Sequence, residues 1–160
     1  MKIALALAVA VLSVPLASQA APGGDDLPAP AQPDRVAAAR QALESRDYKR
    51  AMSELSLALR EQPRNADVHN LLGYTYRMQP QRNLPKSFEH YNTALGIDPN
   101  HRATMEYMGQ AYLMDNKPRE AERLLTRLEA VCGKACNEYR MLEHAISSFK
   151  QSGKAPGSYQ

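Results

Sequence analysis

The sequence predicts an all-α protein in which one helical unit is repeated along the chain. From Arg35 onward, apolar residues recur at the spacing of amphipathic helices, and no stretch alternates apolar and polar residues for long enough to indicate a strand. The same region also aligns with itself at intervals of 34 and 36 residues. Self-similarity at such intervals is typical of repeat architectures, in which helical pairs stack side by side.

The first 20 residues are predicted to be a cleaved signal peptide. They contain Lys2 near the start, an apolar run that ends at Leu12, and the small residues Ser18 and Ala20 before the predicted cleavage point. The apolar run is shorter than the roughly 20 residues needed to span a bilayer, and no later segment approaches that length. We therefore expect an exported protein, periplasmic in a Gram-negative bacterium, without membrane insertion after cleavage. A retained N-terminal membrane anchor is the alternative.

Residues 21–33, APGGDDLPAPAQP, are expected to form a flexible tether. Proline, glycine and alanine dominate this segment, so it has too little apolar surface to form a core, and a short partner-binding motif is the alternative. The remaining residues are enough for one domain, which we place at 34–151, and residues 152–160 are expected to form a flexible tail.

The charge balance gives no indication of a nucleic-acid or membrane partner. The chain has 20 basic and 17 acidic residues, and removal of Lys2 with the signal leaves an even smaller excess. Proteins that bind nucleic acids or anionic membranes carry concentrated basic patches, and this sequence has none. We therefore expect neither kind of partner.

Three repeats follow, at about 32–65, 66–101 and 102–135. Equivalent positions in their second helices are Ala51, Leu55, Ala58 and Pro63, then Ser87, Tyr91, Ala94 and Pro99, then Ala121, Leu125, Leu128 and Gly133. Equivalent positions in their first helices are Ala38, Ala39 and Ala42, then Leu72, Gly73 and Tyr76, then Met108, Gly109 and Tyr112. The first-helix positions are separated by 34 and then 36 residues, whereas the second-helix positions are separated by 36 and then 34. Two additional residues between Tyr76 and Ser87 explain this difference, and the prolines in that interval indicate a lengthened turn.

This pattern resembles the tetratricopeptide repeat (TPR) family. Its sequence of a large apolar residue, Leu-Gly, Tyr, a small residue, an aromatic residue, Ala and a closing Pro is matched best by Leu72, Gly73, Tyr76, Tyr91, Ala94 and Pro99. The third copy has Gly133 in place of the proline, and the first has alanines in place of Leu, Gly and Tyr. The resemblance implies a right-handed superhelical α-solenoid of three helix-turn-helix repeats with a C-terminal capping helix, here at about 136–151. It also implies protein binding as the usual role.

Two glycines lie inside predicted first helices. Gly73 and Gly109 each cost a helix about 1 kcal/mol relative to alanine. We expect them where a neighbouring helix must approach closely, with Ala39 and Ala58 as small equivalents. Pro63 and Pro99 are expected to end second helices.

The cysteines are the only concentrated chemistry in the sequence. Cys132 and Cys136 lie in VCGKACNEYR, and an exported chain with two cysteines favours a disulfide, which would hold the capping helix to the repeats. A redox-active pair and a soft-metal site of the copper type are the alternatives. The spacing differs from the C-x-x-C of thioredoxin-like pairs, and His144 is too far along its helix to join the same metal.

Other catalytic patterns are missing from the sequence. It has no H-E-x-x-H, no glycine-rich phosphate loop and no nucleophile elbow, and its four histidines are scattered and expected on the surface or in the groove. We therefore expect a protein that is not an enzyme and has no cofactor.

A partner is expected to bind on the concave side, which the first helix of each unit lines. Helical geometry places one set of polar and aromatic residues opposite the packing face: Arg40, Asn70, Tyr74, Arg77, Glu106, Tyr107 and Gln110. Tyrosine, arginine and amides are the composition expected of a recognition surface. The sequence thus predicts a non-catalytic adaptor or scaffold that binds a peptide or protein in this groove. The alternatives are a redox or metal accessory protein using Cys132 and Cys136, and a self-assembling structural protein.

Overall fold

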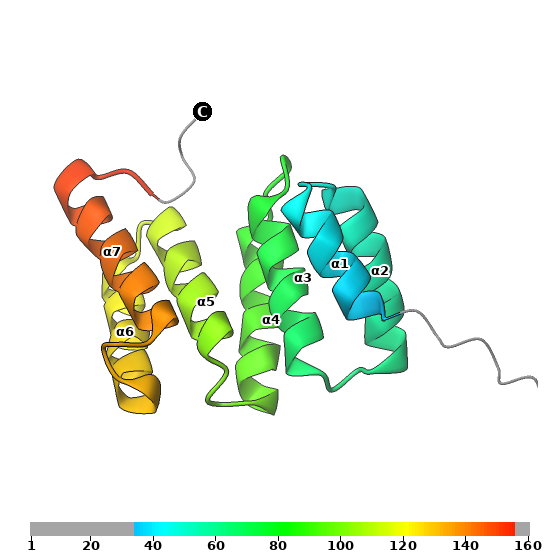
Figure 1. Cartoon of the computed structure of the whole chain (residues 1–160). Coiled ribbons are helices and arrows are strands. Elements are labelled where there is room, and N and C mark those ends of the chain that lie inside the picture. The colour runs from blue at the N-terminus through cyan, green and yellow to red at the C-terminus, as the bar shows by residue number, and fades with distance from the viewer. Residues whose placement is uncertain (1–33, 156–160) are drawn as a thin grey trace, which may run out of the picture. The chain divides into compact units, whose positions relative to one another are not determined.

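The computed structural model describes residues 34–155, which fold into seven α-helices without a strand in that range (Figure 1). The helices are α1 (Arg35–Glu44), α2 (Tyr48–Glu61), α3 (Ala66–Met78), α4 (Leu84–Ile97), α5 (Arg102–Met114), α6 (Pro118–Cys132) and α7 (Asn137–Ser152). The predicted all-α class is confirmed. The predicted signal, the tether and the last five residues of the tail lie outside the described residues. Within 34–155, no helix combines the length and the apolar character that crossing a membrane requires.

Local sequence determines where most of these helices begin and end. Asp34, Asp47, Asn65 and Asn83 precede helices and accept hydrogen bonds from backbone N–H groups of the first turn, which otherwise have no partner. The second helices α2 and α4 end two residues before the prolines at 63 and 99, where the sequence predicted their ends. These four helices therefore carry a side-chain start signal, and two of them are followed by a proline stop signal.

Consecutive helices pack in pairs, α1 with α2, α3 with α4 and α5 with α6. Helices α1, α3, α5 and α7 also contact one another in sequence, and we call them the inner row (Figure 1). Among the described residues, α2, α4 and α6 make no comparable contacts with one another. The inner row is therefore the closely spaced side of the molecule. Helix α7 packs on both α5 and α6, in the position that a further first helix would occupy.

The connection between α3 and α4 is longer than its equivalents. It spans residues 79–83, whereas residues 45–47 join α1 to α2 and residues 115–117 join α5 to α6. The two additional residues inferred from the sequence therefore lie in this connection.

The α1–α2 and α5–α6 turns share one backbone geometry. Their second residues, Arg46 and Asn116, have positive φ values of 59° and 56°. In each turn the following residue, Asp47 or Lys117, donates its N–H over 2.8 Å to a carbonyl of the preceding helix. This bond satisfies a carbonyl that has no partner at a helix C-terminus.

The glycines of the inner row allow close contacts. A Cβ on Gly73 would lie 2.5 Å from Cε1 of Tyr91 on α4, and one on Gly109 would lie 2.5 Å from Cδ1 of Leu142 on α7. The hydroxyl of Ser87 also donates to the carbonyl of Gly73 over 2.7 Å. Neither site has room for a larger residue. The close packing that glycine permits at each site offsets its lower helix propensity.

The buried apolar residues form two clusters. One joins α1, α2 and α3 and includes Ala39, Leu55 and Leu72. The other extends from Tyr91 on α4 through α5 and α6 to α7, where it includes Leu142. Buried polar groups, including Thr75 and Arg77 on α3 and Ser87 on α4, belong to neither apolar cluster.

Candidate functional site

The inner row carries two adjacent hollows that share residues. The first has a volume of about 210 Å³ and is lined by side chains of α1, α3 and α5: Arg40, Leu43, Glu44, Leu71, Tyr74 and Tyr107. The second, of about 330 Å³, also includes Arg40 and Tyr107 and extends to the α4–α5 connection and the first turn of α7. We call these two hollows the groove. Four of the seven predicted groove residues line it: Arg40, Asn70, Tyr74 and Tyr107.

A pair of tyrosines and an arginine join α3 to α5 at the groove. The ring centroids of Tyr74 and Tyr107 are 4.9 Å apart, with an angle of 46° between the rings. The guanidinium carbon of Arg77 lies 5.3 Å from the first centroid and 5.6 Å from the second. A cation at these distances is attracted to both ring faces, and the attraction is stronger where water is excluded. Arg77 therefore holds the two tyrosines in place from beneath.

Two polar side chains of α5 in turn hold Arg77. Its Nη1 donates to Oε1 of Gln110 over 2.8 Å, and the amide of Gln110 donates to the carboxylate of Glu106. Burial raises the pKa of Glu106 to about 7, and the positive charge of Arg77 acts in the opposite direction. The chain of bonds links a titratable group in the interior to the aromatic surface of the groove.

The sequence analysis was wrong about the accessibility of three predicted groove residues. Asn70, Arg77 and Glu106 are buried, with 1%, 2% and 1% of their surface exposed. The reason is the contact between α3 and α5, which encloses side chains that would be accessible on a single helix. Arg77 and Glu106 lie beneath the groove with Gln110, while Asn70 is a buried part of its lining. No hydrogen-bond partner lies within reach of Asn70 Oδ1 or Arg77 Nε.

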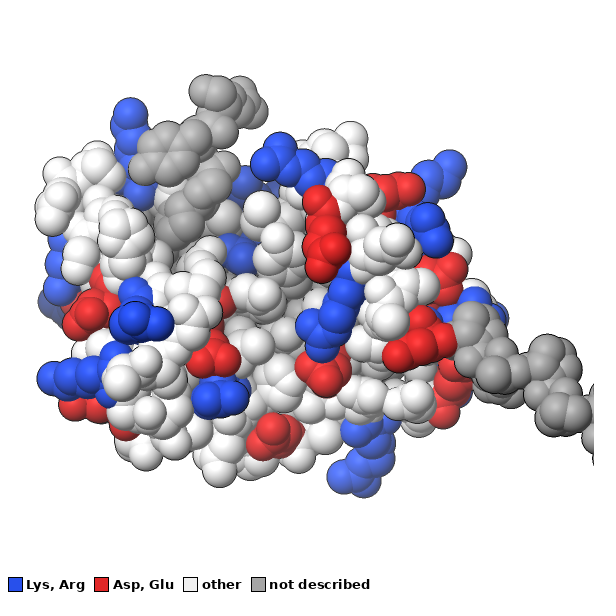
Figure 2. Space-filling model, viewed as in Figure 1, with Lys and Arg blue, Asp and Glu red and all other residues white. Residues whose placement is uncertain are grey.

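Charges of both signs surround the groove. Arg40 and His101 both contact Oδ1 of Asp67, at 3.1 Å and 3.3 Å, so one carboxylate joins α1, α3 and the start of α5. On the face shown in Figure 2, basic and acidic side chains are interspersed. Exposed pairs of this kind contribute about 0–1 kcal/mol each, so they add little to the stability of the fold.

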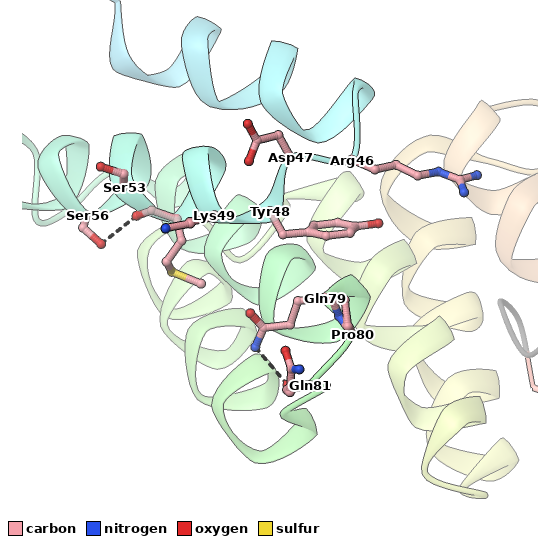
Figure 3. Close-up of a pocket in the computed structure, with 10 residues that line it drawn as sticks. Arg46, Asp47, Tyr48, Lys49, Ser53, Ser56, Gln79, Pro80 and Gln81 are labelled. Carbon is pink, nitrogen blue, oxygen red and sulfur yellow. Dashed lines mark hydrogen bonds between the residues drawn. The ribbon is translucent and has the colours of Figure 1, made fainter.

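A second cavity, of about 670 Å³, lies beside the long α3–α4 connection (Figure 3). The α1–α2 turn and α2 form one wall, and residues 79–81 form the other. Figure 3 shows Tyr48 between the side chain of Arg46 and those of Gln79 and Pro80. The residues that line this cavity are exposed or half-buried, so it has neither a buried polar group nor an aromatic pair like those of the groove. We therefore favour the groove as the functional site.

Two histidines that the sequence analysis placed on the surface or in the groove form a pair between α3 and α4, in which His69 is buried and His90 half-buried. Nδ1 of His69 on α3 and Nδ1 of His90 on α4 are 3.1 Å apart, and Nε2 of His69 is 3.1 Å from the carbonyl oxygen of Pro63. The ring of His90 stacks on Tyr76. Burial, followed by the neighbouring His69, lowers the pKa of His90. The pair joins α3 to α4 and to the preceding turn, so its position indicates a structural role.

The two cysteines lie at the junction of α6 and α7. Cys132 is the last residue of α6, Cys136 directly precedes α7, and their sulfur atoms are 2.07 Å apart, with a Cα–Cα distance of 5.8 Å. The predicted disulfide pairing is confirmed. Gly133, the first residue after α6, has φ = 73°, a conformation that glycine adopts without strain.

Comparison with known proteins does not assign the sequence to a family. No protein-family model matches the sequence, and no curated protein matches it significantly. The functional interpretation therefore depends on the repeat pattern and on the geometry of the groove.

Proposed function

We propose that the described helices form a TPR solenoid, with three repeats, a right-handed superhelical course and α7 as the capping helix. Three observations support this proposal. The helices pair in the order that the repeat predicts, and the extra residues of the second copy fall in its internal connection. Gly73 and Gly109 lie at equivalent positions, and a Cβ on either one would lie 2.5 Å from a side chain of a neighbouring helix. The closely spaced inner row also favours curvature with this row on the concave side.

The proposed function is that of a non-catalytic adaptor or scaffold that binds a peptide or protein in the groove. The observation that carries this proposal is the pair of hollows that share Arg40 and Tyr107. Their surface combines aromatic rings, an arginine and amide groups, a composition typical of protein interfaces. Apolar lining by Leu43 and Leu71 in the first hollow suits an apolar side chain of the partner, and the charged second hollow suits polar groups.

The proposal includes export, which follows from the predicted signal peptide and agrees with the disulfide. Structural disulfides persist in oxidising compartments such as the bacterial periplasm. The proposed place of action is therefore the periplasm if the source is a Gram-negative bacterium, with a protein of the cell envelope as partner.

A photo-crosslinking experiment in cells tests the groove. A photoreactive amino acid replaces Tyr74, which is half-buried in the first hollow, and a matched probe replaces Asn92, which is exposed on α4 and outside both hollows. The expected result is one dominant adduct from the Tyr74 probe and none from the Asn92 probe. Mass spectrometry of that adduct names the partner.

A second pair of variants separates binding from folding. Tyr74→Ala removes a ring from the groove surface, whereas Asn92→Ala removes an exposed side chain of the outer helix. Loss of a well-packed aromatic residue at an interface commonly costs about 2 kcal/mol or more of binding free energy. Equal adduct yields at positions 74 and 92, or no adduct at either, would contradict the proposed function.

A further inference from the structure

The turn between α6 and α7 brings together three side chains that can bind a metal ion. Cys132 ends α6, Cys136 is the N-cap of α7 and Glu138 lies in the first turn of α7. The ligand atoms of these three side chains all lie within 4.8 Å of one another. Residues 34–155 contain no other group of three His, Cys, Asp or Glu side chains with this property. Atoms that bind one zinc ion at about 2.0–2.3 Å can be at most about 4.6 Å apart. In the oxidised structure two of these atoms are bonded to each other, and the Glu138 carboxylate lies within reach of the ion that could bind both sulfur atoms once the bond is reduced.

We propose that this turn has a second, reduced state in which Cys132, Cys136 and Glu138 bind one divalent ion of the zinc class. Two thiolates and one carboxylate suit borderline-soft Zn²⁺, whereas Cu⁺ prefers sulfur ligands. The carboxylate was the ligand missing from the sequence analysis, which considered only the cysteines and a distant histidine. With three protein ligands, water completes a tetrahedral shell.

The two states interconvert through a balanced reaction. A dithiol reductant transfers two electrons and two protons to the Cys132–Cys136 bridge, and the reductant itself becomes a disulfide. Binding of Zn²⁺ to the two thiols then releases their two protons to solvent. The ion takes the place of the covalent bond, so α6 and α7 remain joined in both states.

The local structure favours this exchange. Cys136 precedes a helix whose first backbone N–H groups have no side-chain cap, and a helix N-terminus stabilises a thiolate. All three ligands are half-buried, so that an ion can reach them from solvent. The ion pair of Glu138 with Arg102 is long, at 4.0 Å between Oε1 and Nε, and half of the Arg102 side chain is exposed. Such a pair contributes little, so a metal ion can displace it.

Cobalt titration of the mature protein tests this proposal. The disulfide is reduced with a phosphine, the reductant is removed under argon, and Co²⁺ is added while the thiolate-to-cobalt charge-transfer absorbance is measured. Zn²⁺ is then added to displace the cobalt. Three chains are compared: wild type, Glu138→Gln, and Glu143→Gln as a matched control. Glu143 is an exposed residue of the same helix, and it accepts a hydrogen bond from Tyr139 and makes none to the turn.

The expected result is one cobalt ion per reduced wild-type chain and none on the oxidised chain. Glu138→Gln should weaken binding at least about tenfold, as loss of a ligand or of its support commonly does, while Glu143→Gln binds as wild type does. Glu138→Asp retains a carboxylate on a shorter side chain, and it should give an intermediate affinity. No thiolate–cobalt absorbance in the reduced protein would overturn the proposal, and so would equal affinities of the Glu138→Gln and wild-type chains. Glu138 also lines the second hollow of the groove, but the cobalt titration measures metal binding and the photo-crosslink at Tyr74 in the first hollow measures partner binding, so this proposal and the proposed function can fail separately.

Discussion

Replacement of Gly73 by alanine tests the close packing of α3 on α4. The new Cβ would lie 2.5, 2.6 and 3.0 Å from three ring carbons of Tyr91, which is fully buried. Overpacking of a core commonly costs about 1–3 kcal/mol, and contacts this short belong at the upper end. The gain in helix propensity offsets about 1 kcal/mol of this cost. We therefore expect a net loss of about 2 kcal/mol in the free energy of unfolding.

A second glycine provides a control with the opposite sign. Gly96 is an exposed residue of α4, and a Cβ built there has no neighbouring atom within 4 Å. Gly96→Ala should therefore stabilise the protein by roughly 0.5–1 kcal/mol through helix propensity alone. The same chemical change in two helices that pack together is thus expected to have opposite effects.

Urea denaturation followed by far-ultraviolet circular dichroism measures both effects. A double-mutant cycle adds Tyr91→Leu, which removes the ring that the new methyl group meets. In that background the cost of Gly73→Ala should fall by about 1 kcal/mol or more, because contacting residues couple by amounts of this size. The reasoning is refuted if Gly73→Ala is as stable as wild type, or if its cost is the same with and without the Tyr91 ring.

Three further predictions concern other parts of the fold. Arg46→Gly should raise the thermal midpoint in a melting experiment, because glycine removes a strain of about 1 kcal/mol at a positive φ; a lower midpoint would contradict this. Burial raises the pKa of Glu106 from 4.5 to about 7, so its carboxyl group stabilises the fold below about pH 4.5, and this contribution is lost as the pH rises through 7. Urea midpoints measured across this pH range should fall in wild type and stay constant in Glu106→Gln. If the pH profiles of the two proteins run parallel, Glu106 makes no such contribution. Reduction of the Cys132–Cys136 bridge in the presence of a chelator should cost about 2 kcal/mol in the same assay, and an unchanged midpoint would show that the bridge does not stabilise the cap.

The sequence was sufficient to predict the helices because their signals are local. Apolar periodicity indicates each helix, Asn65 and Asn83 mark helix starts, and Pro63 and Pro99 lie just beyond helix ends. The extra residues of the α3–α4 connection also followed from counting, because repeats allow one copy to be compared with another.

The burial of the polar residues beneath the groove could not be predicted in this way. Arg77 and Gln110 are 33 positions apart, and their contact depends on how closely α3 and α5 approach each other. The sequence analysis placed both residues opposite the packing face, but Arg77 follows Gly73 by four positions and therefore shares the face of α3 that packs on α4. Periodicity also contains no information about the spacing between helices. The nearness of Glu138 to the cysteines was missed for a related reason, since it depends on how the chain turns between α6 and α7.

The division of the apolar interior into two clusters has a consequence for cooperativity. Opening of α1 and α2 disrupts only the cluster that these helices share with α3, whereas the cluster from α4 to α7 stays intact. Regions with separate cores open in separate steps, and the smaller core opens at the lower free-energy cost. Backbone amides of α1 and α2 should therefore exchange hydrogen faster than those of α5 and α6. Because Arg40 on α1 lines both hollows, each such opening removes one wall of the groove. A partner bound in the groove would therefore slow amide hydrogen exchange in α1, although α1 belongs to the less stable half of the protein.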